Sequence, residues 1–240
     1  MIDQRTSTIE DRLRGVKKIV AVSSGKGGVG KSLIASTLAL ILAKKGCKVG
    51  LFDLDFTSPS THVILGVKGV QPKEEKGIVP PEVHGLKYMS ITYYSSDLVA
   101  PLRGADVTNA LIELLSITRW GKLDYLILDM PPGIGDVTLD LIRLIKNTRF
   151  LIVTTSSQLA FETVEKLVSL LKALKIQIIG VVENMKMNNS KTIRQQTEKL
   201  GLKLLAEIPY DPDVEEAIGD TDKLLDTVLA KKVQEASSGI

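Results

Sequence analysis

A glycine-rich segment at residues 25–32 constrains the fold of this 240-residue chain more than any other part of the sequence. It reads GKGGVGKS and fits the pattern G-x-x-x-x-G-K-[ST]. An apolar, β-branched run at residues 17–23 precedes it, and an Ala- and Leu-rich stretch at residues 33–45 follows it. These flanks predict a buried strand, a tight loop and a helix in succession. The alternative is a glycine-rich turn that matches by chance, and both flanks argue against it.

Such a loop has the groups that the phosphates of a nucleotide need. Glycines let successive backbone N–H groups turn toward phosphate oxygens, and the helix that follows adds the positive end of its dipole. Lys31 can reach the terminal phosphates, and the Ser32 hydroxyl can bind Mg²⁺. The expected nucleotide-binding residues of the loop are Gly25, Lys26, Gly27, Gly28, Val29, Gly30, Lys31 and Ser32.

Strand-like and helix-like patterns alternate along the rest of the chain, without repeats or a low-complexity linker. This alternation predicts an α/β fold with a single doubly wound, mostly parallel sheet flanked by helices. We expect a polar segment at residues 1–15 and one domain at residues 16–240. The expected strands lie at residues 48–53, 86–92, 123–129, 150–155, 176–183 and 203–208. The expected helices lie at residues 105–118, 138–146, 159–174, 191–200, 214–217 and near 223–233.

Two aspartates, Asp53 and Asp55, stand at the end of the strand-like run at residues 48–53. At positions i and i+2 of an extended segment they point the same way, so beside the loop they could hold Mg²⁺ through water and orient an attacking water. The alternative is an Asx-type turn that leaves the strand. We favour the functional interpretation because sheets of this kind bind ligands at the carboxyl ends of their strands.

The run at residues 123–129 ends in Asp129, the position expected for a second acidic partner of Mg²⁺. Pro131, Pro132 and Gly133 then predict a fixed turn, whose Gly133 N–H could contact a γ-phosphate and sense its hydrolysis. Alone this segment is a plain turn. Together with the glycine-rich loop about a hundred residues upstream, it indicates a nucleotide switch.

Lys26, at the start of the loop, is a second lysine where one suffices for the phosphates. It is poorly placed for its own nucleotide but could reach across a dimer interface, as an arginine finger supplied in trans does. The alternative is a solvated surface lysine.

The bulk composition excludes several classes. A net charge of +3 is spread along the chain, with no basic arm for nucleic acid. No apolar stretch reaches the roughly 18 residues of a membrane span, and the polar first residues are not a secretory signal. The single cysteine, Cys47, excludes an internal disulfide framework and favours a reducing compartment, the cytoplasm.

With these motifs in view, the chain resembles the Mrp family of iron–sulfur carrier ATPases, within the MinD/ParA superfamily of deviant-Walker P-loop ATPases. The resemblance covers residues 16–212. It rests on residues 22–32, 53–55, 58–60, 103–104, 120–125, 129–136, 181–185 and 208–211. The central segment and the string VVENM at residues 181–185 favour Mrp over MinD or ParA.

The resemblance implies a homodimer that closes around two ATP molecules and hydrolyses them to ADP and phosphate. The implied catalytic residues are Lys26, which bridges to the nucleotide of the partner subunit, Lys31 on the phosphates and Asp55, which positions or activates water. Ser32, Asp53 and Asp129 belong to the implied Mg²⁺ shell. Asn184 recognises adenine, and the segment around Pro209 flanks the base.

One departure concerns the cluster. Mrp proteins that carry iron–sulfur clusters usually have Cys-x-x-Cys shortly after this string, whereas residues 185–191 read MKMNNSK here. A cluster usually needs four thiolates, and a dimer of this chain offers two, both Cys47. Residues 103–106 also read RGAD in place of the usual RGPM. The sequence therefore predicts an intact nucleotide site without a Cys-x-x-Cys cluster site.

We expect a slow, partner-stimulated ATPase linked to iron–sulfur cluster or metalloprotein assembly, acting with a protein client or activator. One alternative is a MinD/ParA-like switch for positioning or partitioning on membrane or DNA, although the chain shows no basic C-terminal anchor. Another is a nucleotide-binding regulator with negligible hydrolysis. The presence of Lys26 and Asp55, the implied catalytic residues, argues against this alternative.

Overall fold

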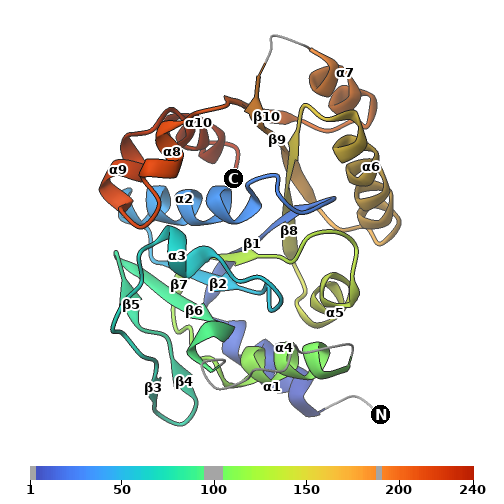
Figure 1. The fold of residues 1–240 in the computed structure, drawn as a ribbon. Coiled ribbons are helices and arrows are strands. Elements are labelled where there is room, and N and C mark those ends of the chain that lie inside the picture. Colours follow the sequence, from blue (N-terminus) through green and yellow to red (C-terminus); the bar gives the residue numbers. More distant parts are fainter. Residues whose placement is uncertain (1–3, 95–104, 188–190) are drawn as a thin grey trace.

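The computed structural model describes residues 4–94, 105–187 and 191–240. In this part of the chain, eight strands form one sheet in the order β10-β9-β8-β1-β7-β2-β6-β5 (Figure 1). All neighbouring strands are parallel except β5 and β6. The doubly wound, mostly parallel sheet that the sequence predicts is therefore confirmed.

The strands of the sheet are β1 (Val16–Ser24), β2 (Val49–Asp53), β5 (Glu82–Val83), β6 (Leu86–Ser90), β7 (Leu123–Asp129), β8 (Thr148–Thr155), β9 (Ile178–Lys186) and β10 (Leu204–Pro209). A separate hairpin joins β3 (Lys73–Glu74) and β4 (Ile78–Val79). The helices are α1 (Gln4–Leu13), α2 (Lys31–Lys44), α3 (Thr61–Ile64), α4 (Ala105–Ile117), α5 (Asp136–Leu144), α6 (Gln158–Ala173), α7 (Thr192–Lys199), α8 (Asp213–Glu216), α9 (Thr221–Asp226) and α10 (Val228–Ser237), with a 3₁₀ turn, η1, at Ile91–Tyr93.

Helices cover both faces of the sheet and bury one apolar cluster on each. Because strand side chains alternate between the faces, Ile19 and Ala21 of β1 join the cluster under α1, α4, α5, α6 and α7, whereas Val20 and Val22 join the one under α2, α3, α9 and α10 (Figure 1). Helix α2 is buried along most of its length. This central packing holds the N-terminus of α2 at the carboxyl edge of the sheet.

The structure differs from the sequence-based expectation at several elements. Residues 4–13 form α1, in which Ile9 and Leu13 lie one turn apart and pack into the core. The helix expected near residues 223–233 is two helices, because Thr227 has an extended backbone and its side chain caps α10 by accepting from the Ala230 N–H. The sequence does not predict the short α3, β3, β4 and β5, and the strand expected at residues 86–92 ends at Ser90, where η1 follows. No helix of the described residues is long and apolar enough to cross a membrane.

Strand register brings the polar strand ends together. Asp129 at the end of β7 lies beside Val22 of β1 on one side and beside Asp53 of β2 on the other. The Leu54 N–H donates to the Asp129 carbonyl at 2.9 Å. The glycine-rich loop and both aspartates therefore meet at one edge of the sheet, as the sequence predicts.

Candidate nucleotide-binding site

The glycine-rich loop connects β1 to α2 and contains two left-handed glycines, Gly28 with φ of 77° and Gly30 with φ of 82°. A Cβ atom on Gly30 would also lie 2.3 Å from Asn184 Nδ2. At Gly25 a Cβ atom would lie 2.2 Å from the Thr163 hydroxyl on α6. A residue other than glycine at position 30 would have a strained backbone and would clash with Asn184. At position 25 it would clash with Thr163.

A cavity of about 440 Å³ opens above this loop. Its volume is within the usual range of small-molecule sites. The lining residues come from the loop, from residues 55–64 and from the turn after β7: Ser24, Lys26, Gly27, Gly28, Gly30, Lys31, Ser32, Leu33, Asp55, Thr57, Ser58, Ser60, Ile64 and Pro132. The structure therefore brings together most of the residues that the sequence predicts for phosphate binding.

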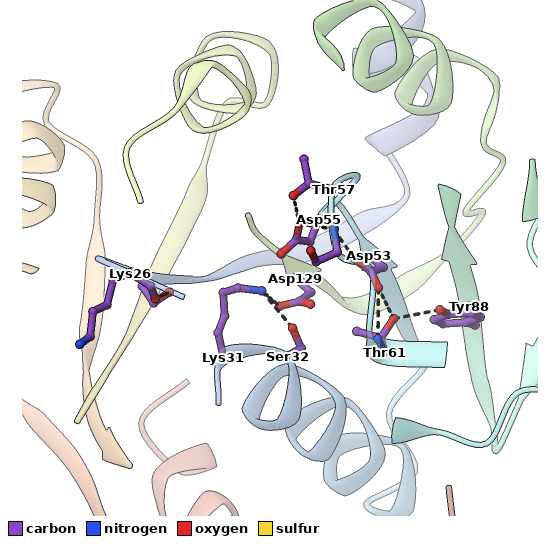
Figure 2. Close-up of polar contacts among 11 residues, drawn as sticks. Lys26, Lys31, Ser32, Asp53, Asp55, Thr57, Thr61, Tyr88 and Asp129 are labelled. Atoms are coloured by element: carbon purple, nitrogen blue, oxygen red, sulfur yellow. Dashed lines mark hydrogen bonds and ion pairs between the residues drawn. The ribbon is translucent and has the colours of Figure 1, made fainter. Parts of the chain in front are cut away.

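Lys31, which lines this cavity, forms a buried ion pair with Asp129 (Figure 2). Lys31 Nζ lies 2.6 Å from Asp129 Oδ1 and 3.1 Å from Ser32 Oγ. The exposed fractions of the two side chains are 7% and 0%. Burial raises the pKa of Asp129 to about 6, against the opposing effect of Lys31 and together with the negative charge of Asp53. The other carboxylate oxygen, Oδ2, is buried without a hydrogen-bond partner among the described residues.

Asp53 lies behind the cavity, fully buried, and Asp55 lines it. Burial raises the pKa of Asp53, and hydrogen bonds from Thr61 and the Asp55 N–H lower it. Asp55 Oδ1 accepts from the Thr57 hydroxyl at 2.8 Å and from the Ser58 N–H at 3.1 Å. Asp55 is thus placed to face a nucleotide, and Asp53 to hold the chain around it. Thr61 and its partner Tyr88 were not among the predicted site residues.

Neither the Lys26 side chain nor the Gly133 N–H is directed at the ion pair of Lys31 and Asp129. The Lys26 side chain points away from Lys31 and Asp129 (Figure 2). The carbonyl of Lys26 accepts from the Ser24 hydroxyl at 2.9 Å. Gly133, with φ of 81°, donates its N–H to the Ser24 carbonyl at 2.9 Å, so this predicted phosphate donor is engaged with the loop itself. Pro132 lines the cavity, whereas Pro131 is not among the described lining residues.

A second cavity, of about 160 Å³, adjoins the first and shares Gly30 and Leu33 with it. Its other lining residues are Asn184, Met185, Pro209, Tyr210, Asp211, Pro212, Val214, Glu215 and Leu229. Asn184 donates from Nδ2 to the Val29 carbonyl at 3.0 Å, and its Oδ1 is buried without a partner among the described residues. Asn184 and Pro209, the predicted base-binding residues, therefore meet beside the phosphate loop.

The donors present fit a Mg²⁺ ion better than an iron–sulfur cluster. The buried, unpartnered Asp129 Oδ2 and the Ser32 hydroxyl are oxygen donors, which Mg²⁺ prefers, and Mg²⁺ keeps several of its waters. In the described part of the chain, no group of three or more His, Cys, Asp or Glu side chains could hold a metal ion. Cys47 lies between α2 and β2, at the opposite edge of the sheet from the cavity. The Arg103-Gly104 segment and residues 188–190 lie outside the described residues.

This fold and site define a P-loop NTPase of the MinD/ParA type. The chain belongs to the ParA family, since the family model described as NUBPL iron-transfer P-loop NTPase matches residues 15–240. It is 40% identical over 221 residues to the iron–sulfur cluster carrier protein of Aquifex aeolicus, which covers 85% of this chain and 61% of that protein. It is 37% identical over 238 residues to the protein of the same name from Escherichia coli K12, and the match covers 93% of this chain and 64% of that protein. The resemblance to the Mrp family is thus confirmed.

Solved structures agree with this assignment. A nucleotide-binding protein from Archaeoglobus fulgidus in complex with ADP is 30% identical with a TM-score of 0.77, covering 92% of this chain and 93% of that one. The septum site-determining protein MinD of Pyrococcus horikoshii, complexed with Mg-ADP, has a TM-score of 0.68 at 21% identity, and the match covers 92% of this chain and 94% of that one. At this identity the likeness shows the fold alone. The chain spans about three-fifths of the length of the first curated relatives it matches.

Proposed function

We propose that this chain is a Mg²⁺-dependent ATPase that works as an ATP-stabilised homodimer in the cytoplasm and serves iron–sulfur cluster or metalloprotein assembly. The observation that carries the ATPase proposal is the buried pair of Lys31 and Asp129 beneath a cavity lined by the glycine-rich loop. The names of the relatives support the link to iron–sulfur clusters.

The chain's own groups suggest how the nucleotide enters. Lys31 exchanges its Asp129 partner for phosphate oxygens, because its amino group already lies at the cavity floor. Asp129 is then left with both oxygens free to accept hydrogen bonds, including those from waters around a cation. Mg²⁺, when bound, neutralises charge on the β- and γ-phosphates. Asp55, at the cavity wall, orients the attacking water, as the family resemblance implies.

Asn184 supports a preference for adenine. Its buried Oδ1 needs a donor, and the 6-position of adenine carries an amino group where guanine carries a carbonyl oxygen. We therefore expect tighter binding of ATP than of GTP.

Exposed apolar side chains support a homodimer that closes over the nucleotide edge. They follow the carboxyl ends of six strands of the sheet and include Val63, Tyr94, Ile134, Leu139, Leu159, Met187 and Tyr210. Burying these side chains against a second copy of the chain would remove apolar surface from water and so would favour association. Lys26 lies at the same edge, and its side chain points away from its own Lys31 and Asp129, which supports a role on the nucleotide of a partner subunit.

The described residues do not offer thiolates for a cluster beside the nucleotide site, so we propose that a partner protein or client holds the cluster. Anaerobic reconstitution with iron and sulfide tests this, with bound iron, visible absorbance and ATP turnover assayed on one sample. We expect ATP turnover without bound iron. Stoichiometric iron with a cluster spectrum would instead show that the chain carries the cluster, and a Cys47→Ser variant would tell whether Cys47 is a ligand.

The alternative of a positioning switch on membrane or DNA has only the shared fold in its favour. ATP-dependent retention on liposomes or on DNA would support that alternative. A wild-type chain that binds ATP with Mg²⁺ but releases no phosphate would favour a regulator without hydrolysis.

A further inference from the structure

The carboxylate of Asp53 fastens both ends of the segment at residues 55–61 (Figure 2). Its Oδ1 accepts from the Asp55 N–H at 3.0 Å. Its Oδ2 accepts from the Thr61 N–H at 3.2 Å and from the Thr61 hydroxyl at 2.6 Å. The segment between these two attachments supplies Asp55, Thr57, Ser58 and Ser60 to the wall of the phosphate cavity. The orientation of one buried carboxylate therefore sets the position of that wall.

Thr61 is itself held by a residue from a different strand. Its hydroxyl oxygen lies 2.9 Å from the hydroxyl oxygen of Tyr88, which is fully buried on β6. β6 lies beside β2, with Tyr88 opposite Leu51. The contact joins residues 27 positions apart in the sequence, so the sheet is what brings them together.

The direction of these hydrogen bonds follows from the donors available. Asp53 accepts backbone N–H groups on both oxygens, and the 2.6 Å approach of the Thr61 hydroxyl requires a proton between the two oxygens. Thr61 has a single hydroxyl proton, which it donates to Asp53, so Tyr88 donates to Thr61. Burial raises the pKa of the Tyr88 phenol, so its hydroxyl keeps the proton that this direction needs.

We propose that Thr61 and Tyr88 are positioning residues of the nucleotide site: the Tyr88 hydroxyl orients Thr61, and Thr61 holds Asp53 and with it residues 55–60 over the phosphates. This inference rests on the proposed ATPase function of the same site. It assigns Asp53 to holding the loop, since three protein donors already occupy its carboxylate. Asp129, with its unpartnered oxygen, remains the carboxylate available to a hydrated cation.

The chain offers a matched control for the Tyr88 hydroxyl. The Tyr93 ring packs edge-on against the Tyr88 ring with centroids 5.9 Å apart, and its hydroxyl is buried without a partner among the described residues. Tyr88→Phe and Tyr93→Phe therefore remove the same atom from neighbouring rings, and only the first removes a hydrogen bond to Thr61. Thr61→Ser keeps the hydroxyl and Thr61→Val removes it, which gives a second pair.

Two readouts test the proposal. Amide hydrogen exchange of the nucleotide-free chain should speed up about tenfold in peptides covering residues 53–61 of Tyr88→Phe, and not elsewhere. In steady-state assays we expect Tyr88→Phe to lower kcat about five- to tenfold with KM for ATP within about twofold. Tyr93→Phe and Thr61→Ser should match the wild type in hydrogen exchange and in kcat. Thr61→Val should lower kcat, and speed up exchange of residues 53–61, at least as much as Tyr88→Phe does.

Equal exchange and equal kcat in Tyr88→Phe and Tyr93→Phe would overturn the proposal. Faster exchange throughout the Tyr88→Phe chain would also overturn it, because that would indicate a general loss of stability. If the wild type itself released no phosphate, the proposed ATPase function would fail, and the exchange of residues 53–61 would still decide whether Tyr88 holds the segment.

Discussion

The two edges of the sheet hold their ion pairs in opposite ways. At the amino edge, Lys17 and Asp124 are 2.8 Å apart with side chains 76% and 31% exposed, and at the carboxyl edge Lys31 and Asp129 are 2.6 Å apart and almost fully buried. The hydrogen bond from Lys17 lowers the pKa of Asp124, whereas burial raises the pKa of Asp129 despite its lysine. An exposed pair contributes little to stability, and a buried pair costs desolvation. The comparison supports our proposal that the carboxyl-edge pair serves nucleotide binding rather than stability.

Lys31→Ala should have the largest effect and tests the buried pair directly. We expect loss of ATP binding by about a thousandfold or more, because the phosphates lose their cation at the cavity floor. We also expect the free energy of unfolding to fall by about 3 kcal/mol at pH 7, since Asp129 stays buried without its partner. Isothermal titration calorimetry and denaturant unfolding measure the two effects. Near-normal affinity would show that the backbone N–H groups alone bind the phosphates.

Lys26→Ala should separate the two lysines of the loop. We expect ATP affinity to stay within about twofold and hydrolysis to fall by about a hundredfold or more, as for a residue supplied in trans. Phosphate release and nucleotide titration on the same preparation check this. Normal hydrolysis by the variant would refute the role of Lys26 across a dimer.

The sequence predicts the parts of the molecule that depend on local patterns. β7 lies at the residues expected, 123–129, because an apolar run that ends in an aspartate specifies a buried strand and its end. The contact of Tyr88 with Thr61 has no such signal, since it depends on the pairing of β2 with β6. The same holds for β5, whose two residues become a strand only by pairing with β6. Helix α1 was not predicted, because Ile9 and Leu13 are too few apolar residues in a polar segment to indicate a helix.

After Lys31→Ala and Lys26→Ala, we expect the next largest effect in the pH dependence of stability, through Asp129. The ordinary Asp pKa of 3.8 rises to about 6 for Asp129 in the folded chain, so folding takes up a proton between these values. As pH rises from about 4 to 6, the nucleotide-free wild type should therefore lose about 3 kcal/mol of stability relative to Asp129→Asn, with no further change above that window.

Denaturant unfolding of both proteins from pH 4 to 7.5 measures this difference. A slope of the opposite sign would mean that the attraction of Lys31 outweighs burial. The carboxyl-edge pair would then behave like the exposed pair of Lys17 and Asp124, and the contrast between the two edges would disappear.

Lys17→Met should have the smallest effect. The pair of Lys17 and Asp124 is exposed and lies on the far side of the sheet from the cavity, so we expect the denaturant midpoint and the ATP affinity both to stay within experimental error. Unfolding and titration experiments run beside those on Lys31→Ala check this. A clear loss of stability would show that the amino edge depends on its surface charges.

The contact of Asn184 with the phosphate loop has a consequence for specificity. Its amide both donates to the Val29 carbonyl and fills the space that a side chain on Gly30 would need. The group that we propose to read the base is therefore also a structural support of the glycine-rich loop. On the proposed role of Asn184, a substitution at residue 184 alone cannot exchange adenine for another base, because any new base reader there must also support the same loop.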